Sequence, residues 1–228
     1  MGVATLIEFH NVAYGYGGRD IFSGLDLALP AGSFHFLTGP SGAGKTTFLK
    51  LCYRDLEASS GRVDFFDQAD NTLDRDAVAK LRRRIGVVHQ DCQFLDHLTI
   101  SENIALPLTV SNRPVSPQDL SDLLVWVGLS DRADALPPEL SGGERQRAAL
   151  ARAIIMSPDV ILADEPTGNV DWDMSLRLLK LLTELNKMGK TVVIATHDLH
   201  LIRQAKSMVQ ARVLRIADKR ILQAGADL

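Results

Sequence analysis

One stretch of the chain has the residue types and spacing of a phosphate-binding loop: Gly39-Pro40-Ser41-Gly42-Ala43-Gly44-Lys45-Thr46. It matches the pattern G-x-x-x-x-G-K-[ST] at every fixed position. Glycines allow backbone N–H groups to converge on phosphate oxygens, because no Cβ atom stands in the way. Lys45 can reach the outer phosphates, and the Thr46 hydroxyl can bind Mg²⁺. We therefore predict that residues 39–46 bind a nucleoside triphosphate, with Thr47 in the same cofactor-binding set.

Acidic and imidazole side chains follow two apolar runs later in the chain. Residues 160–163 and 191–195 have the continuous apolar pattern of parallel strands buried on both faces. In an open α/β sheet, chemistry gathers at the carboxyl ends of the strands. The first run ends in Asp164 and Glu165, and the second leads to His197. We predict that Asp164 holds Mg²⁺, that Glu165 polarises the attacking water and that His197 senses the outer phosphate.

Two further segments each allow two interpretations. Tyr16 lies in a glycine-rich stretch, residues 14–18, that is expected to form a turn. Its ring could stack on a nucleobase, and a packing role fits the spacing equally well. In Ser141-Gly142-Gly143-Glu144 the first and last residues have the spacing of a capping box, which predicts the start of a helix. The two glycines would also leave N–H groups open to an anion, so a second phosphate site remains an alternative.

The elements that must position these residues alternate between strands and helices. Residues 34–37 are predicted to form the buried strand before the phosphate loop, and residues 47–52 the helix after it. The opening of the chain is predicted to form a small antiparallel sheet. Further strands and helices are expected in the following ranges: strands 7–12, 21–29, 62–66 and 85–88, helices 76–84, 148–155 and 173–185, and a hairpin of 208–216 with 220–222.

Residues 91–137 are predicted to be a helical insertion in this α/β chain. A helical section begins near residue 101, and we expect Pro107 to interrupt it. Ser116 and Pro117 are predicted to open a second helix, because these residue types favour the N-cap and the first helical position. Gly128 is expected to end that helix.

Composition and charge exclude several classes of protein. The chain has 228 residues, 46% of them hydrophobic and 23% charged, as is usual for a soluble globular protein. Its net charge of −3 argues against general nucleic-acid binding. The two cysteines, Cys52 and Cys92, lack metal or redox spacing. Neither a signal peptide nor an apolar run of about 18 residues is present, so any membrane role is expected to require a partner.

In their order along the chain, these motifs resemble those of the ATP-binding cassette (ABC) ATPases. Tyr16 resembles the aromatic loop of that family, residues 39–46 its Walker A motif and Gln90 its Q-loop. Leu140-Ser141-Gly142-Gly143-Glu144 resembles the signature, Asp164-Glu165 the Walker B motif with its catalytic glutamate, and His197 the switch histidine. The signature between Walker A and Walker B is the more specific feature. The resemblance implies an α/β fold, in which residues 1–228 form a single ABC nucleotide-binding domain. That domain would contain a P-loop RecA-like core, an N-terminal antiparallel β subdomain and a helical subdomain at about 91–137.

The same resemblance implies an ATP-dependent, head-to-tail homodimer. In this family residues 39–46 of one copy would face residues 141–144 of the other, and residues 168–171 would cross the interface. Gln90 would bind Mg²⁺ and link it, with the attacking water, to the helical insertion; it therefore joins both the metal-binding and the catalytic residues. A groove around residues 90–100 would receive a coupling helix from a membrane protein.

Within the family, the chain resembles the short cassettes of the lipoprotein-releasing, macrolide-efflux and cell-division branch. Residues 102–108 and 163–169 are similar to that branch, and residues 36–45 resemble its cell-division members. This resemblance implies a peripheral protein on the cytoplasmic face of the bacterial inner membrane. Its partners would be the integral membrane protein FtsX and other division proteins, through which ATP turnover would regulate septal peptidoglycan hydrolysis. The alternative is the ATPase of a lipoprotein-releasing or macrolide-efflux transporter.

Overall fold

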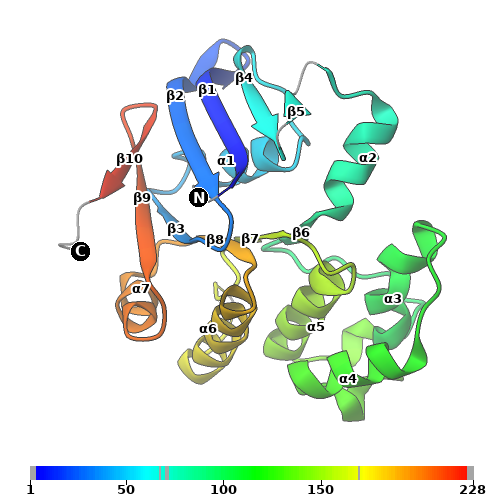
Figure 1. Cartoon of the computed structure of the whole chain (residues 1–228). Coiled ribbons are helices and arrows are strands. Elements are labelled where there is room, and N and C mark those ends of the chain that lie inside the picture. The colour runs from blue at the N-terminus through cyan, green and yellow to red at the C-terminus, as the bar shows by residue number, and fades with distance from the viewer. Residues whose placement is uncertain (1–3, 67, 70–71, 169, 225–228) are drawn as a thin grey trace.

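The computed structural model describes residues 4–66, 68–69, 72–168 and 170–224 of the chain. These residues form two sheets that face each other, as Figure 1 shows, with α1 (Lys45–Cys52) between them. Further helices lie on the other side of the larger sheet, and α3 and α4 form a group of their own at its β6 end. Strands and helices thus alternate in the core, which confirms the α/β fold class.

The smaller sheet is antiparallel and contains the first two strands of the chain. The first strand is longer than expected: Tyr14 and Tyr16 belong to it, and the turn is confined to Gly17 and Gly18. Both glycines have a positive φ, of 53° and 82°, so they make the tight reversal and leave the tyrosines paired with the next strand. In spatial order, the described strands of the smaller sheet are β2 (Arg19–Pro30), β1 (Thr5–Tyr16), β4 (Ser60–Phe65) and β5 (Gln68–Ala69).

The larger sheet brings the carboxyl ends of its central strands to one edge. Its neighbours β6, β7, β8, β3 and β9 are all parallel, and β10 is antiparallel to β9. The hairpin between β9 and β10 was predicted, and Asp218 and Lys219 make its turn with φ of 48° and 61°. In spatial order the described strands are β10 (Arg220–Ala224), β9 (Ala211–Ala217), β3 (Phe34–Thr38), β8 (Thr191–Ala195), β7 (Val160–Asp164) and β6 (Ile85–Val88).

Side-chain caps define where several of the helices begin. Asp171 caps α6 (Trp172–Lys187), and Asp74 caps α2 (Arg75–Arg83). Asp198 caps α7 (Leu199–Lys206), a helix that the sequence interpretation missed because it has only eight residues. The helix α5 (Gly142–Ile154) begins at Ser141, where the predicted capping box with Glu144 is present. None of the helices in the described ranges is long and apolar enough to cross a membrane.

The region after β6 contains α3 (Ile100–Val110), α4 (Pro117–Val127) and the 3₁₀ turns η2 (Ser130–Arg132) and η3 (Pro137–Glu139). The expectation that Pro107 interrupts the first helix is wrong, because α3 continues through it to Val110. Proline removes one hydrogen bond, the one its N–H would donate to the Asn103 carbonyl. A capping box at Thr99 and burial of the first turns keep the helix intact. The predicted Ser116 cap and Gly128 end of α4 are both present.

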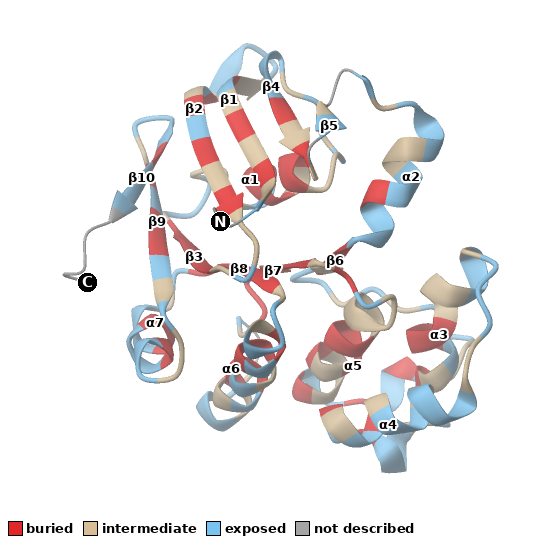
Figure 2. Ribbon diagram, in the orientation of Figure 1, coloured by how far each residue is buried: buried red, intermediate tan, exposed pale blue. Residues whose placement is uncertain are grey.

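The apolar core forms three clusters of buried residues. Figure 2 colours the buried residues red on the ribbon. One lies between the two sheets and includes Phe48 of α1. A second covers the other face of the larger sheet, where α5, α6 and α7 pack. The third joins α3 and α4 to α5. Thus α5 contacts both the larger sheet and the helical region.

Candidate functional site

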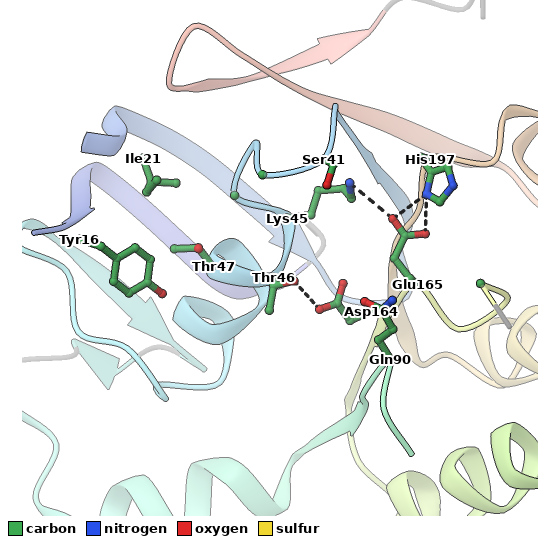
Figure 3. Close-up of a pocket in the computed structure, with 13 residues that line it drawn as sticks. Tyr16, Ile21, Ser41, Lys45, Thr46, Thr47, Gln90, Asp164, Glu165 and His197 are labelled. Carbon is green, nitrogen blue, oxygen red and sulfur yellow. Dashed lines mark hydrogen bonds and ion pairs between the residues drawn. The ribbon is translucent and has the colours of Figure 1, made fainter. Parts of the chain in front are cut away.

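A pocket of about 640 Å³ lies at the carboxyl edge of the larger sheet (Figure 3). Parallel strands β3, β6, β7 and β8 each deliver the residues that follow them to this edge. Most of the residues predicted from the sequence to bind nucleotide meet here, although they are far apart in the chain. The lining residues are Tyr16, Ile21, Ser41, Gly42, Gly44, Lys45, Thr46, Thr47, Gln90, Asp164, Glu165, Gly168 and His197.

The phosphate loop wraps around the start of α1. Gly42 and Gly44 have φ of 75° and 106°, so both adopt backbone conformations that favour glycine. The Lys45 ammonium donates to the carbonyl of Gly39 at 3.0 Å and lies 3.4 Å from a carboxylate oxygen of Glu165. The lysine is therefore held over the loop with its charge directed into the pocket, as a cation that binds phosphate must be.

Thr46 and Asp164 meet at the base of the pocket. The Thr46 hydroxyl donates to Oδ2 of Asp164 at 2.6 Å, and Figure 3 shows the two side chains pointing at each other. Burial raises the pKa of the Asp164 carboxyl, and the hydrogen bond from Thr46 opposes this effect. Both groups were predicted to bind Mg²⁺, and the structure brings their oxygens together.

Glu165 joins the phosphate loop to His197. The Nδ1 atom of His197 lies 3.0 Å from both carboxylate oxygens of Glu165. The glutamate is buried, whereas 74% of the histidine side chain is exposed. Lys45, Glu165 and His197 therefore form a continuous chain of polar contacts across the pocket (Figure 3). A carboxylate between a cation and an imidazole can orient a water and accept its proton.

Magnesium fits the donors present in this pocket. Mg²⁺ prefers oxygen ligands, keeps several waters and is usually held by one or two carboxylates together with substrate phosphates. Thr46 and Asp164 offer a hydroxyl and a carboxylate in contact, and Gln90 lines the same pocket with an amide oxygen. Among the described residues no cluster of three or more His, Cys, Asp and Glu side chains could hold a metal alone. The donor set thus suits an ion shared with phosphates.

The pocket wall on the side of the smaller sheet is partly apolar. Tyr16 lines it with 48% of its surface exposed, and its ring packs edge-on against Tyr14 at 5.0 Å between centroids. Ile21 lies beside it and was missed, because an isoleucine in an alternating strand carries no signal of a binding role. The exposed ring face leaves base stacking available, so that prediction stands beside the packing contact with Tyr14.

Some predicted residues lie outside the lining set. Gly39, Pro40 and Ala43 belong to the phosphate loop but do not line the pocket. Gly168 does line it, although it was predicted only as part of an interface segment. Of that segment, Asn169 lies outside the described residues. A separate hollow of about 540 Å³, lined partly by residues 90–94, coincides with part of the groove expected for a membrane partner.

Residues 141–144 do not line the pocket. Ser141 and Gly142 are exposed at the start of α5, and the Glu144 carboxylate accepts hydrogen bonds from the Ser141 N–H at 2.8 Å and from Arg132 at 3.0 Å. The bonds from Ser141 come first among the causes that lower the pKa of Glu144 to about 2. The capping interpretation is confirmed. The second interpretation, an anion site, remains a prediction. Because residues 141–144 lie away from the pocket of their own chain, they cannot contact a nucleotide bound there.

Comparisons with known proteins agree on one kind of protein. A family model described as ABC transporter matches residues 22–168. The cell division ATP-binding protein FtsE of Haemophilus influenzae is 44% identical over 205 residues, which cover 87% of this chain and 93% of that protein. FtsE of Bacillus subtilis is 39% identical over 209 residues, covering 90% and 92%.

Solved structures give the same result. The dimeric ATP-binding cassette MJ0796, in a post-hydrolysis state bound to ADP and Pi, superposes with a TM-score of 0.84 at 31% identity and covers 96% of this chain and 98% of that one. The cassette cbiO1 of Clostridium perfringens, part of the transporter complex cbiONQ, has a TM-score of 0.84 at 26% identity, covering 96% and 88%.

Proposed function

This chain belongs to the ABC transporter family and is an ATPase of that family, and we propose that it serves as the ATP-hydrolysing subunit of a bacterial cell-division complex. Its similarity to FtsE proteins of two distant bacteria, over about nine tenths of the chain, supports the cell-division role. The chain of contacts from Lys45 through Glu165 to His197 carries the hydrolytic role, because it joins a phosphate-binding cation to a carboxylate that can activate water.

Within the pocket, each side chain has a proposed task that follows from its chemistry. Lys45 binds the outer phosphates of ATP, exchanging its contact with the Glu165 carboxylate for one with phosphate oxygens. Thr46, Asp164 and Gln90 would hold Mg²⁺, which would neutralise charge on the phosphates when bound. Tyr16 and Ile21 form an apolar wall suited to the base.

Glu165 orients the attacking water and accepts its proton. Loss of the contact with Lys45 opens an acceptor position on the Glu165 carboxylate for that water, while His197 holds the carboxylate in place through Nδ1. The side chain of His197 is exposed at the pocket, so it can respond to the terminal phosphate of a bound nucleotide. Hydrolysis therefore depends on one carboxylate, and nucleotide binding does not.

A Glu165→Gln protein tests this role. The amide keeps the size and one hydrogen-bonding oxygen but cannot accept a proton, so turnover should fall by about a hundredfold or more while ATP affinity is retained. Steady-state phosphate release and titration with a fluorescent ATP analogue measure the two quantities. An Asp173→Asn protein, changed at an exposed carboxylate of α6, is the matched control and should keep wild-type turnover. Wild-type turnover in the Glu165→Gln protein would refute the assignment.

We also propose that two copies assemble head to tail around two ATP molecules. Support comes from the placement of Ser141 and Gly142, which are exposed and away from the pocket of their own chain. A helix N-terminus with open N–H groups is suited to phosphate, and the segment can reach one only in another copy. The similar cassette MJ0796 is dimeric in two solved structures.

The proposed membrane partner is FtsX, which would convert ATP-driven closure of the dimer into regulation of septal peptidoglycan hydrolysis. The protein would then be peripheral on the cytoplasmic face of the inner membrane. Affinity purification of the tagged chain from solubilised membranes tests this proposal: recovery of FtsX supports it. Recovery of a lipoprotein-releasing or macrolide-efflux membrane subunit in its place would favour a transporter ATPase.

A further inference from the structure

The segment that follows Gln90 has no regular structure, so its backbone carbonyls need partners from elsewhere in the fold. Two arginines of α5 supply them. Arg145 donates through Nη2 to the carbonyl of Cys92 at 3.1 Å, and Arg152 donates through Nη1 to the carbonyl of Gln93 at 2.6 Å. Hydrogen bonds from a charged guanidinium to a carbonyl are stronger than those between neutral groups. The position of Gln90 in the pocket thus depends on α5.

Phe94 strengthens the same attachment. The guanidinium carbons of Arg145 and Arg152 lie 5.5 Å and 4.6 Å from the centroid of its ring, within the range of cation–π contacts. The two arginines are seven residues apart, about two helical turns, so both project from one face of α5. We call Phe94, Arg145 and Arg152 the Phe94 clamp.

Arg145 also reaches a second segment. Its Nη1 atom donates to the carbonyl of Pro137 at 3.0 Å. Pro137 begins the short turn η3, which ends immediately before Leu140 and Ser141. One planar guanidinium is therefore bonded to the chain that follows Gln90 and to the chain that precedes Ser141. Gln90 faces the nucleotide pocket of its own chain, whereas Ser141 is exposed outside it.

We propose that Arg145 is a positioning residue that couples the nucleotide pocket of one copy to the Ser141 segment it presents to the other copy. A shift of the Gln90 segment changes the carbonyl position of Cys92, and the rigid guanidinium passes that change to Pro137. Lysine has one rotatable point charge and cannot hold two carbonyls in a fixed relation. The inference rests on the proposed head-to-tail dimer, because only there does Ser141 meet a nucleotide.

The clamp itself can be tested without reference to the dimer, since the chain contains a suitable probe. Of its two cysteines, Cys52 is fully buried, and Cys92 is half-buried and accepts the hydrogen bond from Arg145 through its carbonyl. In the full-length protein, N-ethylmaleimide should label Cys92 about tenfold faster after Arg145→Ala, because the loss of a charge-assisted hydrogen bond opens the segment. Peptide mass spectrometry assigns the labelled site. Arg203→Ala on α7, an exposed arginine, is the matched control and should leave the rate unchanged.

Coupling is tested by separating turnover from nucleotide affinity. Arg145→Ala should lower kcat about tenfold while the Kd for ATP stays at the wild-type value, since Arg145 does not line the pocket. Arg145→Lys should keep the melting temperature of the wild type yet restore neither slow labelling nor full kcat. If Arg145→Ala fails to fold, the lysine variant carries the test.

Three results would overturn the proposal. These are an unchanged labelling rate in Arg145→Ala, an unchanged kcat despite faster labelling, and full rescue by lysine. The proposed function fails differently: if Glu165→Gln retained wild-type turnover, the hydrolytic assignment would be wrong while the labelling rates would still decide whether Arg145 holds the Gln90 segment.

Discussion

At the scale of single residues, Glu165 combines an unusual backbone conformation with a central place in the pocket. Its φ of 43° is in the left-handed region, which non-glycine residues rarely adopt. The backbone turns sharply here, directly after β7, and its N–H donates to the Ala195 carbonyl of β8 at 2.9 Å. This turn directs the side chain to Lys45 and His197. Strained conformations of this kind gather at functional sites, where surrounding structure holds them.

His35, a polar residue in the central strand β3, had no explanation from the sequence. The structure buries it and pairs its Nε2 atom with the Ser33 hydroxyl at 2.8 Å. Its Nδ1 atom has no hydrogen-bond partner within the part of the chain that the structure describes. Burial, with a smaller effect of Arg212 opposite it on β9, lowers the pKa of His35 to about 4. The imidazole is thus neutral near pH 7.

This pKa predicts acid sensitivity of the fold. The unfolded histidine has a pKa near 6.5 and binds more protons between pH 6.5 and pH 4 than the folded one, so the stability present above pH 6.5 falls as the pH drops towards 4. The loss from His35 should reach about 3 kcal/mol. Urea unfolding of the wild type and of His35→Gln at several pH values measures it. The difference between the two proteins should change across this window, and a constant difference would contradict the prediction.

At the scale of elements, α3 shows how tertiary packing overrides a helix breaker. Ile100 and Ile104 are fully buried against α4 and α5, and the Asn103 side chain bonds three carbonyls of the preceding loop. These contacts offset the hydrogen bond that Pro107 cannot make, which net is worth about 1 kcal/mol. The rule that proline breaks a helix therefore failed here, because packing of α3 stabilises the helix by more than the lost hydrogen bond costs.

Replacement of that proline should stabilise the protein. Pro107→Ala restores an N–H that can donate to the Asn103 carbonyl, so the free energy of unfolding should rise by about 1 kcal/mol. Urea unfolding at pH 7.5 measures the change. The control is Pro117→Ala in α4, where proline stands in the first turn and its missing N–H has no helical partner; it should give no gain. Equal gains in the two variants would contradict the explanation.

At the scale of the whole molecule, the two segments predicted to bind phosphate are separate. The loop of residues 39–46 contributes Ser41, Gly42, Gly44, Lys45 and Thr46 to the pocket, while residues 141–144 lie at the start of α5 outside it. In a dimer with twofold symmetry, each active site would combine the loop of one copy with the Ser141 segment of the other. Two differently damaged chains should then be able to form one intact site together.

A mixture of two variants tests whether the two copies share each site. Lys45→Ala removes the phosphate cation of one chain, and Ser141→Arg places a bulky side chain at the exposed segment of another. Each variant alone should be inactive. An equal mixture should regain about a quarter of wild-type turnover, because half of the dimers are mixed and each holds one intact site. Phosphate release measures the mixture, and the double variant Lys45→Ala, Ser141→Arg mixed with itself is the control. No recovery in a mixture that dimerises would refute the shared site.

The sequence predicted most of the elements and the position of the pocket. Periodic apolar patterns located the strands of the larger sheet, and the rule for parallel sheets predicted that residues 39–46, Glu165 and His197 share one edge. The limits of the antiparallel strands were less well predicted, because Tyr14 and Tyr16 sit beside glycines that resemble turn residues. Helix α7 was missed, since eight residues give too short a periodic pattern.

The sequence by itself determined the chemistry of this protein. The types and spacing of residues 39–46 and the carboxylates after an apolar strand require a nucleotide site, because backbone amides, a lysine and acidic oxygens are what phosphates and Mg²⁺ bind. Only the tertiary structure decided which side chains touch. The contact of Lys45 with Glu165 and the hydrogen bond from Arg145 to Cys92 join residues far apart in the chain, and the lowered pKa of His35 comes chiefly from burial. Those depend on the packing of the whole fold, which no local pattern encodes.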